Sequence, residues 1–239
     1  MLGRALNKKL AIGIVGATGK FGSVLQQELE KEGFDVVLTV SRRSRTETGS
    51  PDVIVDASHP SALADTIRLC QHHGSALLVC TSGLSAFHHA ALEALAEEVT
   101  VVRAPNLSLG YWILTGALQL ALRRVGGMGM NPETVVHDRH PKTKKDAPSA
   151  TALSLAATVE TETGKNPLEI TFDRQGEPVN DHAVNIFLDG EYLSLKHGVE
   201  EIQAMARGAV MAVRWIVKTP PALVTITDVY DELLLRRLG

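Results

Sequence analysis

An apolar run, a glycine-rich turn and a helical pattern follow one another without interruption near the N-terminus. Residues 10–15 are almost entirely apolar, and residues 23–29 carry apolar side chains at helical spacing. The turn between them has glycine at every third position, at Gly16, Gly19 and Gly22. This order predicts a buried strand that leads into a helix, which is the context of a dinucleotide-binding turn.

The glycine turn is a candidate site for the pyrophosphate of a dinucleotide. We expect Gly16 to permit the tight turn, Gly19 to let backbone approach the pyrophosphate, and Gly22 to let the helix pack on the strand. The candidate cofactor residues of this turn are Gly16, Thr18, Gly19, Lys20, Phe21 and Gly22. The spacing is GxxGxxG rather than GxGxxG, so a turn with only a packing role is the alternative.

The end of the second predicted strand indicates which dinucleotide is bound. This strand covers residues 35–41, and its end should lie beside the adenosine ribose. A site that prefers NAD usually has Asp or Glu there, whereas this chain has Ser41, Arg42 and Arg43. Guanidinium groups suit a 2′-phosphate through their charge and planar geometry. We therefore expect NADPH in preference to NADH, although NADH use stays open; a solvated run of charges is the alternative.

Three further strand-like runs alternate with helical patterns up to residue 107, at residues 52–57, 75–81 and 99–103. This alternation predicts an α/β fold with a Rossmann-like, doubly wound parallel sheet. Ligands bind such sheets outside the carboxyl ends of the strands. The residues that follow these strands are therefore further cofactor candidates, namely Ser58, Thr81, Ser82, Gly83, Ala104, Pro105 and Asn106.

The pattern changes in the second half of the chain. A helical run over residues 109–124 leads into several strand-like runs with one helix among them, and Asp189-Gly190 is a hairpin signal. These features predict an α+β unit with a mostly antiparallel sheet. We expect a dinucleotide-binding domain over residues 1–107, a second domain over 108–217, and a C-terminal return to the first domain over 218–239.

The stretch from residue 137 to 152 concentrates charge in front of a helix start. It follows a strand predicted over residues 133–137, and it contains four cationic side chains and two histidines. Lys144 can direct its ammonium group toward an anion bound at the helix start, and His140 is near enough in sequence to join it. A solvated basic loop before an ordinary helix is the alternative.

The helix start itself has the features of an anion site. Pro148 fits the first turn and Ser149 is a typical N-cap residue, so the helix is expected over residues 149–162. The amides of Ala150, Thr151 and Ala152 are then expected to lie unpaired at the positive helix end, which suits a carboxylate or a phosphate. The candidate ligand-binding residues are Lys144, Ser149, Ala150 and Thr151.

Composition limits the partners and the compartment. A net charge of −3 and an aromatic content of 4% argue against a nucleic-acid partner. No stretch approaches the ~20 apolar residues of a membrane span. Cys70 and Cys80 have neither metal-ligand spacing nor a disulfide framework, so we expect free thiols, no metal site and a cytoplasmic protein.

Taken together, the motifs resemble the dihydrodipicolinate reductase family, the 4-hydroxy-tetrahydrodipicolinate reductases of lysine and diaminopimelate biosynthesis. The signature Lys-x-Asp-Ala-Pro-Ser-Gly-Thr-Ala is highly specific to this family and nearly intact at residues 144–152. The likeness extends over nearly the whole chain, and it covers residues 16–22, 56–60, 81–83, 104–110, 144–152, 181–182 and 206–209, together with Arg174.

The resemblance implies an activity and roles for residues. It implies NADPH-dependent reduction of a dicarboxylate, 4-hydroxy-tetrahydrodipicolinate, with hydride from the nicotinamide and a proton from a cationic side chain. His140 matches the first histidine of the family's His-His pair, and Lys144 matches its catalytic lysine. Lys144 and the amides of Ala150 and Thr151 would hold a substrate carboxylate. The resemblance also implies that the central domain binds the substrate and assembles a homotetramer.

Several residues depart from the family pattern. Pro141 stands where the family has its second histidine, and Ala150 replaces the glycine of the signature. These departures concern the substrate more than the fold or the cofactor. Two alternatives therefore stay open, namely a reductase of another cyclic imine or enamine acid, and an NADPH-binding sensor without catalysis.

Overall fold

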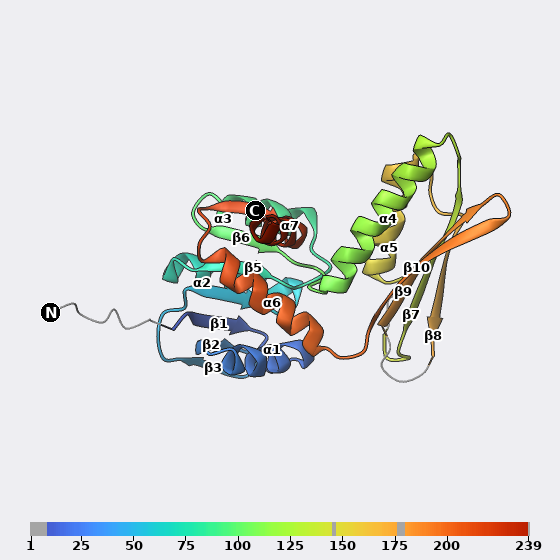
Figure 1. Ribbon diagram of the computed structural model, residues 1–239. Coiled ribbons are helices and arrows are strands. Elements are labelled where there is room, and N and C mark those ends of the chain that lie inside the picture. The colour runs from blue at the N-terminus through green and yellow to red at the C-terminus, as the bar shows by residue number, and fades with distance from the viewer. Residues whose placement is uncertain (1–8, 145–146, 176–179, 239) are drawn as a thin grey trace. The chain divides into compact units, whose positions relative to one another are not determined.

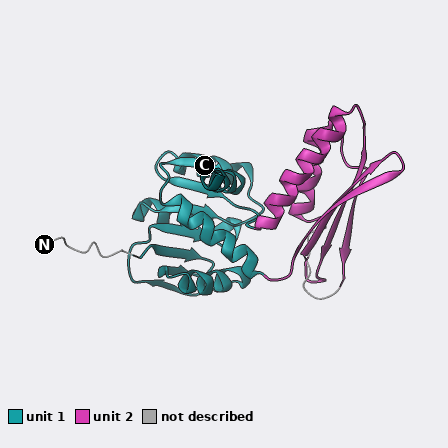
Figure 2. Cartoon of the chain, viewed as in Figure 1, with its two compact units in different colours: residues 1–107, 202–239 teal, residues 108–201 magenta. Residues whose placement is uncertain are grey.

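The computed structural model describes residues 9–144, 147–175 and 180–238, which form two compact units. Unit 1 combines the part of the chain up to Leu107 with the part from Ile202 onward, and unit 2 comprises Ser108–Glu201 (Figure 2). The first unit is therefore built from two separate parts of the chain. The second unit is continuous.

Unit 1 is a seven-stranded sheet in the order β11-β6-β5-β4-β1-β2-β3 (Figure 1). All neighbouring strands are parallel except the β2–β3 pair. The strands are β1 (Ala11–Val15), β2 (Asp35–Val40), β3 (Arg45–Glu47), β4 (Val53–Asp56), β5 (Ala76–Val79), β6 (Thr100–Arg103) and β11 (Ala222–Thr225). The Rossmann-like parallel sheet predicted from the sequence is confirmed.

The central strands β1, β4 and β5 are almost entirely apolar because both faces of the sheet are covered there. Ile54 and Leu77 pack in one cluster with Leu63 and Leu92, while Val53, on the other face of β4, is also fully buried. The helices are α1 (Lys20–Lys31), the 3₁₀ helix η1 (Pro60–Ala62), α2 (Leu63–His73), α3 (Ala86–Leu95), α6 (Gln203–Ile216) and α7 (Ile226–Leu238). Among the helices described in either unit, none has the length and hydropathy needed to cross a bilayer.

Helix α6 returns the chain to unit 1 earlier than the sequence predicted. Eight of its fourteen residues are buried, and it packs beside α1 and against β5 and β6 (Figure 1). Arg214 of α6 also donates to Glu32 at the end of α1, at 2.6 Å. Unit 1 therefore resumes at Ile202, whereas the predicted boundary lay after residue 217. An amphipathic pattern shows that a helix has a buried face, but it does not show which surface covers that face.

Unit 2 is a four-stranded sheet in the order β10-β9-β7-β8, with α4 and α5 on one face (Figure 1). Strand β7 is antiparallel to β9 and parallel to β8, and β9 and β10 form the hairpin predicted around Asp189-Gly190. The predicted α+β unit with a mostly antiparallel sheet is confirmed. Its elements are α4 (Leu109–Gly127), β7 (Glu133–His140), α5 (Ala150–Thr163), β8 (Glu169–Arg174), β9 (Asn180–Leu188) and β10 (Glu191–Val199).

Strand β7 carries polar side chains into the helix-covered side of this sheet. Residues two apart on a strand share a face, and Val136 packs with Leu118 of α4 in the core of unit 2. Asp138 and His140 lie on the same face and are also buried. The predicted strand ended at His137, three residues too early, because the charged residues that follow are typical of a solvated loop when the sequence is taken alone.

Candidate functional site

The glycine turn of unit 1 connects β1 to α1 at the carboxyl edge of the sheet. Gly16 has a φ of +87°, and its amide donates to the Val40 carbonyl at 2.8 Å. A Cβ on Gly16 would overlap the carbonyl oxygen of Ala57, and a Cβ on Gly22 would overlap that of Gly16. Glycine is therefore required at both positions, for the turn and for the close approach of the helix.

The start of α1 is open to solvent beside this turn. Gly19 is its N-cap residue and provides no side-chain cap, and the first helical turn has no acidic residue. Thr18, Gly19 and Lys20 are exposed, and Phe21 is half-buried. An exposed helix N-terminus suits a pyrophosphate, so the geometry of this turn is compatible with the predicted role.

A short turn after β2 carries the two predicted arginines. The Ser41 hydroxyl accepts from the amide of Arg43 at 3.3 Å and so helps to close the turn. Arg42 and Arg43 are exposed, whereas Arg45 pairs with Glu47 at 2.5 Å. Since the last residue of β2 bonds the glycine turn, both exposed guanidinium groups belong to the same edge of the sheet as the turn.

Ser58 and Thr81, which follow β4 and β5, are brought together by a buried carboxylate. The Ser58 amide donates to Thr81 Oγ1 and to Asp56 Oδ1, each at 3.1 Å, and the Ser58 hydroxyl donates to the same Asp56 oxygen. Asp56 is fully buried, and this burial raises the pKa of its carboxyl. Asp56 was not a candidate from the sequence, yet it fixes the backbone that Gly16 approaches.

The remaining cofactor candidates follow β5 and β6 at this edge, namely Ser82, Gly83, Ala104, Pro105 and Asn106. The carbonyl of Leu107, the next residue, accepts from the Tyr230 hydroxyl of α7 at 2.7 Å. A Cβ on Gly208 of α6 would overlap this same oxygen. The two C-terminal helices therefore fix the segment after β6, through contacts between residues about a hundred positions apart that no local pattern predicts.

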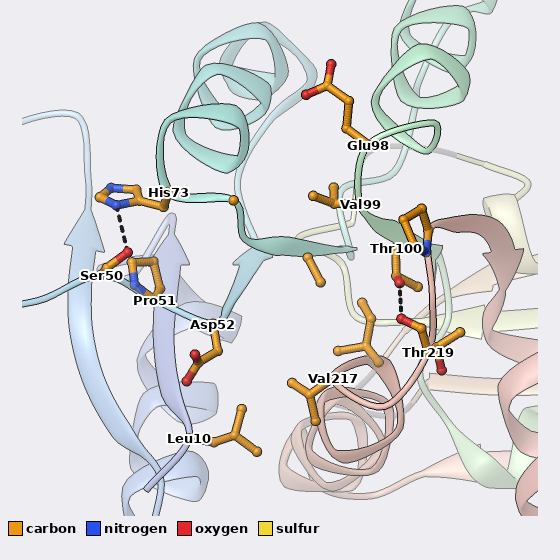
Figure 3. Close-up of a pocket in the computed structure, with 14 residues that line it drawn as sticks. Leu10, Ser50, Pro51, Asp52, His73, Glu98, Val99, Thr100, Val217 and Thr219 are labelled. Atoms are coloured by element: carbon orange, nitrogen blue, oxygen red, sulfur yellow. Dashed lines mark hydrogen bonds between the residues drawn. The ribbon is translucent and has the colours of Figure 1, made fainter. Parts of the chain in front are cut away.

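A pocket of unit 1 lies at the opposite edge of the sheet (Figure 3). Residues at the starts of strands line it, among them Asp52 and Thr100. Its polar groups bond within the pocket wall: His73 Nδ1 lies 3.2 Å from the Ser50 hydroxyl, and the Thr100 hydroxyl donates to the Thr219 carbonyl at 2.7 Å. Because doubly wound sheets bind ligands at their carboxyl edge, this pocket is not part of the candidate site.

Unit 2 holds a buried carboxylate surrounded by donors, that of Asp138. Its Oδ2 accepts from the Ser149 amide at 2.9 Å and from Arg174 Nη2 at 3.0 Å. Its Oδ1 accepts from the Ser149 hydroxyl at 3.0 Å and lies 2.7 Å from His140 Nδ1. His182 Nε2 is 3.4 Å from the same oxygen. Three strands and the start of α5 therefore meet at this carboxylate.

Three histidines extend from this carboxylate across β9 to β10. The ring centroids of His140 and His182 are 5.0 Å apart, and His182 and His197 stack at 6.4 Å. His197 Nε2 is 3.0 Å from the hydroxyl of Ser108, the N-cap residue of α4. His140 was predicted as a site residue, whereas His197 was missed because its partners are distant in sequence.

Burial keeps these imidazoles neutral. It lowers the pKa of His182 to about 4, and the neighbouring His140 adds to this effect. Burial also lowers the pKa of His140, against the opposing charge of Asp138, while the positive charge of Lys144 lowers it further. Burial alone would raise the pKa of Asp138, but the hydrogen bonds that it accepts, first from the Ser149 amide, lower it. The site therefore combines an ionised carboxylate with neutral histidines at pH 7.

The start of α5 differs in one respect from the prediction. The Ser149 hydroxyl accepts from the Ala152 amide at 3.2 Å, so this amide is not unpaired, because the N-cap side chain satisfies it. Ser149 itself is buried, Ala150 is exposed and Thr151 is half-buried. Lys144 lies in the loop between β7 and α5, where its amide donates to the Pro141 carbonyl at 3.0 Å. Residues 145–146 of the predicted stretch lie outside the described residues.

Within the described parts of the chain, Asp138, His140 and His182 form a group that could offer three ligands to a metal ion. However, Arg174 and Ser149 already donate to both oxygens of this carboxylate. A second cation would have to displace these donors and face the charge of Arg174. The occupied carboxylate and the nearby guanidinium group therefore disfavour a metal ion at this cluster.

Both units match one sequence family. Residues 10–107 match the family described as dihydrodipicolinate reductase, N-terminus, and residues 113–230 match the one described as dihydrodipicolinate reductase, C-terminus. The 4-hydroxy-tetrahydrodipicolinate reductase of Thermosipho africanus is 30% identical over 223 residues, which cover 93% of this chain and 99% of the relative. The enzyme of the same name from Halorhodospira halophila is 30% identical over 264 residues, covering 92% and 98%.

Solved structures agree with the fold. Dipicolinate-bound dihydrodipicolinate reductase from Paenisporosarcina sp. TG-14 superposes with a TM-score of 0.72 at 17% identity, covering 91% of this chain and 97% of that one. An amine dehydrogenase from Mycobacterium smegmatis superposes with a TM-score of 0.61 at 12% identity, covering 92% and 96%. Both superpositions show that this chain shares its fold with these proteins over nearly the whole length.

Proposed function

This chain belongs to the dihydrodipicolinate reductase family, and we propose that it reduces 4-hydroxy-tetrahydrodipicolinate to tetrahydrodipicolinate with a pyridine nucleotide, in lysine biosynthesis. The observation that carries this proposal is that both units match the family over almost their whole length. Each unit also contains the chemistry that its part of the reaction requires. Unit 1 has the glycine turn, and unit 2 has a carboxylate–histidine cluster beside a helix start.

Unit 1 binds the cofactor in this proposal. The glycine turn and the start of α1 hold the pyrophosphate, and Arg42 and Arg43 hold the 2′-phosphate of NADPH, with NADH as a weaker second cofactor. Ser58, Thr81 and the segment 104–106 line the nicotinamide end; this assignment is supported by their position after strands β4, β5 and β6, at the carboxyl edge of the sheet. When bound, the cofactor supplies the hydride, so the part played by the protein is orientation and charge.

Unit 2 binds the dicarboxylate and supplies the proton. Lys144 and the amides of Ala150 and Thr151 hold one carboxylate, since a lysine and a helix N-terminus both favour negative charge. His140 donates the proton that accompanies reduction. Burial lowers the pKa of its imidazole and so favours the neutral form. An anionic substrate raises this pKa, so substrate binding itself favours uptake of the proton.

The homotetramer is proposed from the resemblance and from the open face of the sheet in unit 2. Helices α4 and α5 pack on one face. On the other face Phe187 and Tyr192 lie opposite each other in the β9–β10 ladder, 41% and 68% exposed. Exposed apolar side chains on a sheet mark a surface for association.

A cytoplasmic location is proposed from the free thiols of Cys70 and Cys80.

The test is oxidation of NADPH by the purified protein, with dihydrodipicolinate synthase supplying the substrate in a coupled assay. We expect turnover on the order of 1–1000 per second. Binding of NADPH without turnover would contradict the proposal. It would favour the second candidate, a reductase of another cyclic imine acid, which the departures at Pro141 and Ala150 support. The next substrates to assay would then be other cyclic imine carboxylates.

A further inference from the structure

The loop that carries Lys144 is closed at its base by one buried carboxylate. The loop leaves β7 at His140 and reaches α5 at Ser149. Asp138 contacts both of these residues, through His140 Nδ1 at 2.7 Å and through the amide and hydroxyl of Ser149 at 2.9 and 3.0 Å. We propose that Asp138 is a positioning residue, which holds both ends of this loop and orients His140. This proposal rests on the function assigned above to the unit 2 site.

The contact between Asp138 and His140 follows from their spacing in β7. Asp138 and His140 are two residues apart in β7, so their side chains emerge on one face. The contact is close, although its angle is not that of a regular hydrogen bond. The negative charge of the carboxylate favours the protonated form of the ring. Because the carboxylate faces Nδ1, the opposite ring nitrogen, Nε2, is the one that it directs toward a reacting group.

The contact with Ser149 orients the helix start. The Ser149 hydroxyl donates to Asp138, which leaves its lone pairs to accept from the Ala152 amide at 3.2 Å. The Ser149 amide donates to the other oxygen of the same carboxylate. Asp138 thereby sets the direction of the capping hydroxyl and the position of the first turn of α5. The amides of Ala150 and Thr151, which the proposed function assigns to a substrate carboxylate, belong to that turn.

A second acid of the same sheet provides a matched control. Asp181 of β9 is also buried and also binds cations, Arg139 at 2.6 Å and Lys196 at 3.2 Å. It neighbours His182 in the chain, so its side chain emerges on the opposite face from that of His182. Replacing Asp181 removes a buried, paired charge from the same sheet without touching the loop that carries Lys144. A general loss of stability would therefore affect both variants, whereas a loss of positioning would affect only one.

The kinetic test compares Asp138→Asn with Asp181→Asn in the full chain. Asn keeps the shape of the side chain but loses the charge and one acceptor. We expect kcat to fall about 100-fold in Asp138→Asn, since small misplacements of reacting groups have effects of this size. The KM for the dicarboxylate should rise, while the KM for NADPH, which binds unit 1, should not change. Asp181→Asn should lower kcat far less than Asp138→Asn does, because Asp181 pairs with Arg139 and Lys196 and not with His140 or Ser149.

A pH titration separates positioning from folding. Four charged or titratable groups face His140, namely Asp138 on its own strand, Lys144 in the loop, Arg174 of β8 and His182 of β9. Asp138 is the one whose charge raises the pKa of His140, and the positive groups lower it. Removing the carboxylate should therefore move the titration of His140 to lower pH, which nitrogen-15 NMR of histidine-labelled protein measures directly. His140→Gln assigns the signal.

The outcomes distinguish this proposal from the proposed function. If Asp138→Asn folds and matches Asp181→Asn in kcat and in the His140 titration, the positioning role is excluded. If the wild type does not reduce the dicarboxylate, the proposed function fails, but the NMR titration still decides the role of Asp138. If Asp138→Asn does not fold, Asp138→Glu replaces it, because it keeps the charge and displaces it by one methylene. We expect about tenfold lower kcat there, and wild-type kcat with wild-type titration would contradict the proposal.

Discussion

Lys144 is the cation whose loss should affect the substrate most directly. It is half-buried in the loop between β7 and α5, whereas Lys142 of the same loop is exposed. In Lys144→Ala we expect kcat/KM for the dicarboxylate to fall about 10- to 100-fold, because the loss of one hydrogen bond to a charged group has an effect of this size. Lys142→Ala should change it by no more than about twofold. Steady-state kinetics of both variants make the comparison, and equal losses would show that the loop contributes only a general positive charge.

Arg42 and Arg43 are expected to decide between the two nucleotides. Both are exposed after β2, while Arg45 is engaged by Glu47. Replacing both Arg42 and Arg43 by alanine should weaken NADPH binding by about 10- to 100-fold and leave NADH binding unchanged, because only NADPH carries the 2′-phosphate. Arg45→Ala is the control. Fluorescence titrations with each nucleotide measure this, and a parallel loss of NADH affinity would refute the assignment.

Residues of the site could be predicted where their chemistry is local in sequence. His140, Lys144 and Ser149 belong to one short stretch, so their proximity follows from the chain. Asp138 was missed although it stands in the same stretch, because its role depends on Arg174, which is 36 residues away. In the sequence alone a charged residue beside others is typical of a solvated loop. The local indication of a buried role for Asp138 is its spacing from His140, because residues two apart on a strand share a face.

At the level of elements, apolar runs identified every parallel strand of unit 1 except the last. Strand β3 was missed because its three residues are all exposed and polar, so no apolar pattern marks it. Strand β11 was assigned only to a C-terminal tail, since its four residues are half-buried. The parallel pairing of β11 with β6 follows from the return of the chain through α6, and such a long-range return leaves no local signal.

The close packing of α6 on the segment after β6 leads to a prediction about Gly208. A methyl group there would overlap the Leu107 carbonyl oxygen, a backbone atom that cannot rotate away. Gly208→Ala should therefore destabilise unit 1 by about 1–3 kcal/mol, as overpacking does elsewhere, and weaken NADPH binding. Urea unfolding measures the stability.

Gly116 of α4 is the matched helical control for that substitution. A Cβ at this position meets open space, and alanine is the better helix former. Gly116→Ala should raise stability by about 0.5–1 kcal/mol. If both substitutions had the same effect, the close approach between α6 and Leu107 would not be the reason for glycine at position 208.

At the scale of the whole molecule, the two units differ in how the chain builds them. Unit 2 is continuous, whereas unit 1 is completed only when its C-terminal segment adds β11 to the sheet and Tyr230 bonds the Leu107 carbonyl. The sheet that carries the glycine turn therefore includes residues that lie more than a hundred positions after it. Each ligand should accordingly stabilise one unit as a whole rather than a single motif.

Hydrogen exchange followed by mass spectrometry tests this division. NADPH at about 100 times its Kd stabilises the state that binds it by about 2.7 kcal/mol. We expect slower exchange throughout unit 1, including α6 and α7, and a smaller change in unit 2. Dipicolinate, which is bound in the reductase structure from Paenisporosarcina sp. TG-14, should instead protect β7, β9 and the start of α5. If dipicolinate protected the glycine turn and left β7 unchanged, the assignment of the substrate to unit 2 would be wrong.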